Sequence, residues 1–370
     1  MPPSTRTKWL VTGAAPVAAL LLLELGLRLC GFEQPPVKVP LVIWRDDQDA
    51  TLGQHTALHR ADRWSLWAPR PGAMVRRETG ERIGSLGLRG PDPVGSPGPS
   101  ELRVVLLGES STFGLGVPWE QTCAPLLEDQ LEQRGLGADV LNAGVIAHTV
   151  CQGVGRYVST VRPLRPDVVV VAYGAQNEHA PRQGPSDRDK LELSRRQHDG
   201  RPPAWHRLSA HLRVIQLANR VLLRREWTRF AAVQAEELRQ RSQDPALIGQ
   251  PDWPGDRRVN LDEFEAALAE LCAQIEADGA RPILVSLPRT PQTEQRLPIL
   301  PLYSAAIERV AAERGLALVD LRAAVLDAAA AGEDAASFFL GTDTWHVGPR
   351  GQELLAHMLA DALVAPTAAR

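Results

Sequence analysis

The sequence predicts an α/β fold, a doubly wound three-layer α/β/α arrangement around a parallel sheet of about five strands. Two observations lead to this prediction. Short, strongly apolar runs are typical of strands buried on both faces. The segments between these runs have helical spacing of apolar residues, and strands that alternate with helices form a parallel sheet covered on both sides. No internal repeat is visible, and one such domain with insertions could fill the 370 residues.

Each predicted strand is a short run dominated by apolar residues. The run 102–108, LRVVLLG, ends in glycine, and the run 167–174, DVVVVAYG, is the clearest strand of the chain. The other three runs are, in chain order, 138–144, 281–288 and 316–321. Helices are predicted over 119–134, where apolar residues recur at helical spacing, and over 149–161, which the sequence PLRP ends.

Residues 1–32 predict a membrane anchor. Basic residues precede an apolar run, 9–23, that is shorter than the about 20 residues of a membrane span. The run reaches that length at Leu29 if Glu24 and Arg28, four residues apart on a helix, pair or reach the interface. The basic flank then places the rest of the chain outside the cytoplasm, in the periplasm or at the cell surface. A cleaved signal peptide, which would give a secreted protein, is the alternative.

The remaining chain divides into a lead-in, 33–100, and an α/β domain, 101–370. The lead-in is rich in proline, glycine and tryptophan, so we expect an extended segment that packs on the domain. Residues 180–255 do not follow the strand–helix rhythm and predict an insertion, with an amphipathic helix over 204–241 that has a basic face. The insertion could cap the functional site, lie against a membrane, or form a solvated helical excursion packed on the domain.

Composition and charge exclude several classes of protein. Apolar residues make up 44% of the chain, as in ordinary globular proteins and unlike disordered ones. The formal net charge of −3 gives no sign of a nucleic-acid partner. Neither the four cysteines nor the histidines and acidic residues have metal-ligand spacing, so we expect no metal and no cofactor. A disulfide between Cys123 and Cys151 stays open, since it requires Cα atoms about 5–6 Å apart.

Polar residues follow the ends of the predicted strands, where open α/β sheets bind their ligands. The first strand ends in GESSTFG, which places Ser110 at a tight strand-to-helix junction. A serine there is well placed as a nucleophile, and nearby backbone N–H groups can stabilise an oxyanion. Serine is also a common helix cap. A phosphate-binding loop is excluded, because no lysine follows in a GxxxxG frame.

Later strand ends and the C-terminal region add further candidates. The second strand is followed by AGVIAHT, with Gly144 and Ala147, and the third by QNE, with Asn177. The amide of an asparagine at a strand end suits a developing alkoxide, although such a residue is often part of a plain turn. Asp343 and His346 are three residues apart before the last predicted helix. On a tight turn, that carboxylate can orient an imidazole that deprotonates a serine.

These four blocks, in this order at strand ends, resemble the SGNH/GDSL hydrolase family over residues 103–365. The resemblance implies a flavodoxin-like domain in which Ser110 is the nucleophile, His346 is the base and Asp343 orients His346. It also implies an oxyanion hole formed by Asn177, by the backbone N–H of the nucleophile and by a backbone N–H of the loop after the second strand. The lead-in sequence SLGLRGPDP is similar to that of membrane-tethered bacterial members.

Three departures from the family pattern bear on the site. Glu109 replaces the usual aspartate of the GDS block, which lengthens a supporting side chain. The glycine of the second block falls on Ala147, whose methyl group could restrict φ, so the oxyanion donor of this loop is either Ala147 or Gly144. The third block reads GAQNE, so Asn177 is identified by the acid that follows it more than by the glycine.

The predicted function is hydrolysis of an ester bond by a serine hydrolase of the esterase, lipase or carbohydrate-deacetylase type. The expected partners are a small-molecule, lipid or acylated-carbohydrate ester as substrate and, through the N-terminal helix, the membrane. Two alternatives stay open: an O-acyltransferase that uses the same triad, and a non-catalytic binding module of the cell envelope. His148 and His179 lie beside the second and third blocks and could line the pocket, whereas Trp345 is expected to pack against the core or the pocket wall.

Overall fold

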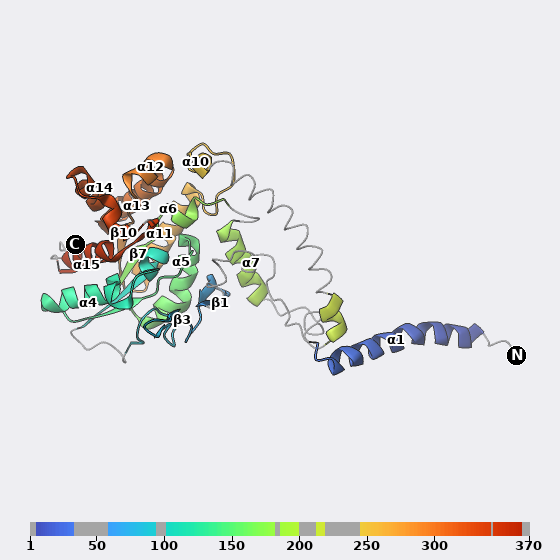
Figure 1. Ribbon diagram of the computed structural model, residues 1–370. Helices are drawn as coiled ribbons and strands as arrows, with labels where there is room; N and C mark the ends of the chain where they lie inside the picture. Colours follow the sequence, from blue (N-terminus) through green and yellow to red (C-terminus); the bar gives the residue numbers. More distant parts are fainter. Residues whose placement is uncertain are drawn as a thin grey trace. The chain divides into compact units, whose positions relative to one another are not determined.

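A computed structural model describes residues 5–32, 58–93, 101–181, 186–199, 212–218, 245–341 and 343–364. The chain forms two units, whose elements are drawn in sequence colours in Figure 1. One unit consists of Met1–Leu41 and Arg196–Gln243, and the other of Val42–Arg195 and Asp244–Arg370. The second unit contains every candidate site residue that the sequence predicts.

A five-stranded parallel sheet forms the centre of the second unit, with strand order β6–β5–β7–β8–β9. The strands are β5 (Leu102–Gly108), β6 (Ala138–Asn142), β7 (Val168–Ala172), β8 (Arg281–Ser286) and β9 (Ala317–Asp320). All neighbouring strands in this sheet run parallel. The predicted α/β class with a parallel sheet of five strands is therefore confirmed.

Alternate residues of each strand enter two separate hydrophobic cores, one on each face of the sheet. Val105 and Leu107 enter one core, and Val104 and Leu106 enter the other. The first core is covered by α5 (Val150–Arg156), α11 (Leu261–Ala277) and α13 (Leu300–Arg314), and the second by α4 (Cys123–Gln133) and α15 (Pro349–Val364). Figure 1 shows α4 and α15 packed side by side.

Shorter elements connect these layers. They are α3 (Ser110–Phe113), α6 (Ala175–Glu178), α12 (Pro291–Arg296), α14 (Leu321–Ala330), the 3₁₀ turns η1 (Trp119–Gln121), η3 (Arg162–Leu164) and η4 (Ala335–Phe338), the π-helical turn η2 (Tyr157–Val161), and the strands β10 (Phe339–Leu340) and β11 (Asp343–Val347). The helix predicted over 119–134 therefore begins as η1 before α4, and the helix predicted over 149–161 passes from α5 into η2.

Residues 58–93 of the lead-in form two antiparallel hairpins, where the sequence predicted an extended segment. The strands are β1 (His59–Asp62) with β2 (Leu66–Pro69), and β3 (Met74–Arg76) with β4 (Glu81–Arg82). Pairing satisfies backbone groups that a buried extended segment would leave without partners. Leu66, Trp67 and Leu88 are buried in the core that α5 and α11 cover.

Arg89 joins the lead-in to the segment after α3. Its side chain is 1% exposed, and Nε donates to Glu81 Oε1 at 2.8 Å. Nη1 donates to Phe113 O at 2.5 Å and Nη2 to Val117 O at 2.6 Å. Its backbone N–H donates to Asn142 O at 3.0 Å. One arginine thus ties the lead-in both to the segment after α3 and to the last residue of β6.

The polar start of the predicted insertion forms α7 (Asp187–Asp199), and α10 (Pro245–Ile248) precedes the return of the chain to the sheet. Leu191 of α7 is buried in the core that α5 and α11 cover. The amphipathic helix predicted over 204–241 lies outside the described residues, apart from 213–218, which are helical.

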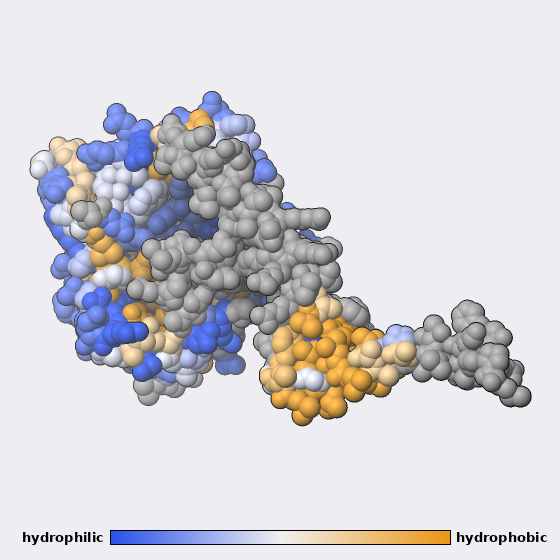
Figure 2. All heavy atoms as spheres, turned by 45° about the vertical axis from the view of Figure 1, so that its right-hand side comes forward, coloured by the Kyte–Doolittle hydropathy of each residue, from blue (hydrophilic) through white to orange (hydrophobic). Residues whose placement is uncertain are grey.

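The other unit contains the N-terminal helix α1 (Thr5–Leu29), which appears orange in Figure 2 where its residues are described. No helix in the described part of the chain is both long and apolar enough to cross a membrane. The predicted anchor, the membrane as a partner and the localisation derived from them are therefore wrong. A charge pair interrupts the apolar run: Arg28 Nε donates to Glu24 Oε1 at 2.8 Å. The uninterrupted run is shorter than the about 20 residues that a span needs.

All four cysteines are free thiols. Cys123 is buried in the core that α4 and α15 cover, and Cys151 in the core that α5 and α11 cover. The sheet lies between the two thiols, so the disulfide that the sequence left open does not form.

Candidate active site

The junction between β5 and α3 places Ser110 at the carboxyl edge of the sheet. β5 ends at Gly108, Glu109 is the N-cap residue, and Ser110 begins α3. A Cβ at position 108 would lie 2.1 Å from Thr112 Oγ1 and 2.4 Å from Ala172 O. Only glycine therefore allows the chain to turn this tightly from strand into helix, with the serine at the edge where α/β sheets bind ligands.

The structure brings Ser110, His346 and Asp343 into one hydrogen-bonded line. Ser110 Oγ lies 3.0 Å from His346 Nε2, from which it is separated by 236 positions in the sequence. His346 Nδ1 lies 2.6 Å from Asp343 Oδ2. These distances suit a nucleophile, its base and a carboxylate that orients the base.

Asp343 and His346 lie on the strand β11, and not on the tight turn that the sequence predicted. Side chains three residues apart on a regular strand point to opposite faces. Here β11 pairs with β10 through a register shift, and Asp343 Oδ1 accepts the N–H groups of Trp345 at 2.8 Å and His346 at 3.2 Å. These bonds fold the carboxylate back along its own strand, so that Oδ2 meets the imidazole.

The same hydrogen bonds determine where the protons lie. Burial alone would raise the pKa of Asp343, but hydrogen bonds from His346 and Trp345 hold that pKa below its usual value. The carboxylate is therefore ionised at neutral pH and accepts the proton on His346 Nδ1. The lone pair on Nε2 then faces Ser110 Oγ, as a general base requires.

Asn177 lies in α6 beside the same site, but its amide is already engaged. Nδ2 donates to Glu109 Oε2 at 2.8 Å and to His148 O at 2.9 Å. A primary amide has two hydrogens, so an oxyanion would have to displace one of these two acceptors. Glutamate is one methylene longer than the aspartate of the family pattern, and here its carboxylate accepts from Asn177.

The loop after β6 distinguishes its two candidate donors. The Gly144 N–H donates to Asn142 Oδ1 at 3.0 Å, and a Cβ at position 144 would lie 2.5 Å from the backbone nitrogen of Phe113. Gly144 therefore allows close packing against α3. Ala147 has a φ of +62°, in the left-handed region, and its N–H has no acceptor among the described residues. Of the two residues, Ala147 has the N–H that an oxyanion could use.

Two buried carboxyl groups and a buried arginine lie near this site. Burial raises the pKa of Glu109, while the charges of Arg289 and His346 oppose that shift. Burial, with the charge of Glu109, raises the pKa of Glu178 to about 8. Arg289 is 3% exposed, and its Cζ lies 5.3 Å from the centroid of the Trp345 ring. The cation lowers the cost of burying the acidic groups, because opposite charges attract strongly in a low-dielectric environment.

Sequence reasoning missed Gln176 and Arg289. Gln176 Nε2 lies 3.4 Å from His346 Nε2, so this amide contacts the predicted base. Arg289 directly follows the predicted strand 281–288, and Gln176 is the second residue after the predicted strand 167–174. Every polar residue just beyond a strand end is a candidate in an open α/β sheet, and this signal points to both.

The remaining candidates near the pocket are packed. His148 is fully buried and its Nε2 donates to Trp67 O at 2.9 Å, while burial holds its pKa well below the usual value. His179 stacks on Trp345 with ring centroids 5.7 Å apart, and burial lowers the pKa of His179 to about 4. Within the residues that the structure describes, no group of three or more histidine, cysteine or acidic residues could hold a metal ion.

A model of the GDSL-like lipase/acylhydrolase family matches residues 106–354, more than half of the chain. The match begins within β5 and ends within α15, so it includes Ser110, Asn177, Asp343 and His346. No curated protein matches the chain.

Several solved structures are similar at low identity. The lipase/acylhydrolase from Enterococcus faecalis is 17% identical, with 71% of this chain and 95% of that chain covered and a TM-score of 0.43. The acetylxylan esterase Axe2 from Geobacillus stearothermophilus is 17% identical, with 73% and 96% covered and a TM-score of 0.44. LAE5, an α/β hydrolase enzyme from the metagenome of Lake Arreo, is 17% identical, with 72% and 97% covered and a TM-score of 0.44.

Proposed function

The chain belongs to the GDSL-like lipase/acylhydrolase family, and from this premise we propose that Ser110, His346 and Asp343 form its catalytic triad. Membership of the family makes the chain a serine ester hydrolase. The observation that supports the triad is the unbroken line of hydrogen bonds, 3.0 Å from Ser110 Oγ to the imidazole and 2.6 Å from the imidazole to the carboxylate. The proposed substrates are esters of lipids, of small alcohols or of carbohydrates.

In the first half of the proposed reaction, Ser110 Oγ bonds to the carbonyl carbon of the ester while its proton passes to His346 Nε2. The carbonyl oxygen becomes an oxyanion. It accepts hydrogen bonds from the N–H groups of Ser110 and Ala147, and from Asn177 once that amide turns away from Glu109. Collapse of the intermediate breaks the bond to the alcohol oxygen, and the alcohol leaves with the proton from His346.

In the second half, water takes the place of the alcohol. His346 Nε2 accepts a proton from water as the water oxygen bonds to the acyl carbon. The second intermediate collapses, the acid leaves, and the proton returns to Ser110 Oγ. Asp343 stays ionised throughout and stabilises the imidazolium that forms in each half.

Hydrolysis of p-nitrophenyl acetate and p-nitrophenyl butyrate by the full chain tests this proposal. Ser110→Ala is expected to lower kcat by at least about 10³-fold, because the nucleophile is lost. Ser111→Ala is the matched control: Ser111 is the next residue, is equally buried, and its substitution leaves the nucleophile in place. Hydrolysis that survives in Ser110→Ala at the wild-type rate would contradict the triad.

A further inference from the structure

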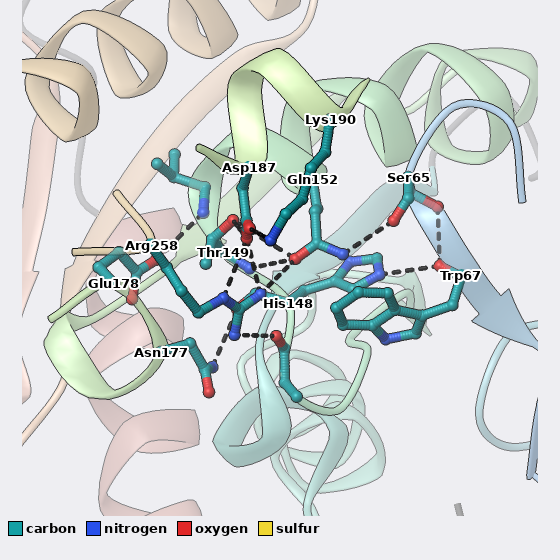
Figure 3. A network of polar contacts seen from close by, with 12 residues as sticks. Ser65, Trp67, His148, Thr149, Gln152, Asn177, Glu178, Asp187, Lys190 and Arg258 are labelled. Atoms are coloured by element: carbon teal, nitrogen blue, oxygen red, sulfur yellow. Dashed lines mark hydrogen bonds and ion pairs between the residues drawn. The ribbon is translucent and has the colours of Figure 1, made fainter. Parts of the chain in front are cut away.

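The loop that contains Ala147 is held by side chains from three distant parts of the chain. Figure 3 shows the network around it, with Arg258 and Asp187 on one side and Trp67 on the other. Trp67 Nε1 donates to Ile146 O at 3.0 Å, and Arg258 Nη1 donates to Ala147 O at 3.1 Å. The next carbonyl, of His148, accepts from Asn177 at 2.9 Å. Three successive carbonyls of the loop thus each accept a hydrogen bond from a side chain.

These contacts act on the backbone dihedral angles of Ala147. The Ile146 carbonyl and the Ala147 N–H belong to one planar peptide group and point in opposite directions. Trp67 therefore sets the direction of the Ala147 N–H by binding the carbonyl on the other side of that plane. Arg258 fixes the following peptide plane through the Ala147 carbonyl. With both planes held, φ of Ala147 stays at +62°.

Arg258 is itself held in place by a buried acid. Its Nη2 and Nε donate to Asp187 Oδ2 at 2.7 Å and 3.1 Å, and Nη2 also donates to Gln152 Oε1 at 3.0 Å. Asp187 is 1% exposed, and the same Oδ2 accepts from Thr149 Oγ1 at 3.1 Å. Burial alone would raise the pKa of Asp187, but Arg258 and Lys190 hold that pKa below its usual value, so the Asp187 carboxylate stays ionised at neutral pH.

An external hold on Ala147 has a physical reason. The left-handed region is unfavourable for any residue with a Cβ, because the Cβ approaches the following carbonyl oxygen. Glycine adopts a positive φ at no such cost. This chain has alanine at the position, and the surroundings have to stabilise a conformation that alanine alone would leave.

We propose that Arg258, held by Asp187, is a positioning residue for ester hydrolysis. Together with Trp67 it keeps Ala147 in the left-handed conformation, in which the Ala147 N–H is free to bind the oxyanion. The inference rests on the proposed function, since an oxyanion forms only if Ser110 attacks an ester. In the family pattern a glycine adopts this conformation unaided. Here the proposal gives that task to an ion pair between Asp187, near the start of the predicted insertion, and Arg258, just after its end.

Substitution of Arg258 in two backgrounds tests the inference, with p-nitrophenyl acetate as substrate. Arg258→Gln is expected to lower kcat by about 10²-fold with KM changed by less than about twofold, because a transition-state donor is misplaced. Arg258→Lys should recover part of the loss, since a cation that can reach Ala147 O remains. In the Ala147→Gly background, Arg258→Gln should lower kcat by less than about fivefold, because glycine reaches a positive φ without help.

Arg257→Gln is the matched control. Arg257 is the preceding residue and also donates to backbone carbonyls, those of His179, Ile248 and Gln250, but to none in the loop of Ala147. Its loss should change kcat by less than about twofold. Trp67→Phe keeps an aromatic ring and removes the donor to Ile146 O. It should likewise lower kcat more with alanine than with glycine at position 147. It also serves as a second variant if Arg258→Gln unfolds, which thermal denaturation would show.

The inference would be overturned if Arg258→Gln lowered kcat equally with alanine and with glycine at position 147. It would also be overturned if the substitution raised KM and left kcat unchanged. A loss in Arg257→Gln as large as that in Arg258→Gln would overturn it as well. These outcomes are distinct from failure of the proposed function. If the wild-type rate survives in Ser110→Ala, the triad fails; if Ser110→Ala is inactive while Arg258→Gln keeps the wild-type kcat, only the positioning role fails.

Discussion

Asn177 Nδ2 lies 2.8 Å from Glu109 Oε2, so the amide that the family pattern assigns to the oxyanion is bound to the side chain just before the nucleophile. The other hydrogen of this amide is donated to His148 O. Glu109 is fully buried, and its carboxylate lies one methylene further from the backbone than that of an aspartate. We therefore propose that Glu109, which departs from the GDS block, competes with substrate for an oxyanion donor.

Glu109→Asp is expected to raise activity. The shorter carboxylate loses its hold on Asn177, and the amide, held then only by His148 O, can turn toward the oxyanion. We predict a severalfold increase of kcat on p-nitrophenyl acetate, of about 3- to 10-fold, with KM nearly unchanged. A decrease of kcat would instead mean that Glu109 orients Asn177 for catalysis, and would refute the competition.

Asp343→Asn is expected to inactivate the enzyme without unfolding it. Asparagine keeps an oxygen for the N–H groups of Trp345 and His346, but it no longer stabilises a proton on His346 Nδ1. The proton then resides on Nε2, where it blocks the acceptor that faces Ser110. We predict a fall of kcat by about 10³- to 10⁴-fold. Asp334→Asn is the control, since Asp334 caps η4 away from the site; comparable losses in both variants would contradict the assignment.

Glu178 makes the stability of the fold depend on pH. Its pKa is about 8 in the folded chain, against about 4.3 in an unfolded one. Between these values the folded chain binds more protons than the unfolded chain, so the free energy of unfolding falls as pH rises from about 4 to 8. Glu178→Gln keeps an acceptor for the Val150 N–H and has no charge to bury.

The wild-type chain should therefore lose about 2–4 kcal/mol more than Glu178→Gln between pH 5 and pH 8. Urea denaturation at the two pH values measures the difference. If the two chains show the same pH dependence, Glu178 does not hold its proton in the folded state.

Arg89 is expected to be important for stability. Arg89→Met keeps the aliphatic volume but leaves Glu81 and the carbonyls of Phe113 and Val117 without their donor. We predict a loss of about 3–5 kcal/mol in the free energy of unfolding, measured in urea. Arg82→Met is the control, because Arg82 is exposed and donates to a single carbonyl, of Gly72. An equally small change in both variants would show that the lead-in does not brace the segment after α3.

The sheet could be predicted from the sequence because its three central strands, β5, β7 and β8, are buried on both faces. A parallel strand between two helical layers reads as a continuous apolar run, and the runs 102–108 and 167–174 correspond to β5 and β7. The lead-in hairpins and β10–β11 could not be predicted in the same way. They are short and carry polar residues, and the lead-in is held by contacts to residues distant in sequence, such as the hydrogen bond from Arg89 to Phe113 O.

At the site, the residues could be named from sequence but their hydrogen bonds could not. Ser110 and His346 were candidates because of local pattern and order, whereas their 3.0 Å contact depends on how β11 returns to β5. The choice between Gly144 and Ala147 needed the φ of +62° at Ala147 and the clash that a Cβ would make at Gly144. The membrane prediction failed because a helical run that contains Glu24 and Arg28 does not have the apolar length of a span.

Covalent labelling by a fluorophosphonate, with the adduct located by mass spectrometry, tests the central claim most directly. A serine whose proton is taken by a neighbouring imidazole attacks phosphorus irrespective of the ester that the enzyme prefers. We predict one adduct per chain, on Ser110, absent in Ser110→Ala and formed at least about 10²-fold more slowly in His346→Ala. An adduct on another residue, or a labelling rate that His346→Ala does not change, would contradict the claim that Ser110 is a nucleophile activated by His346.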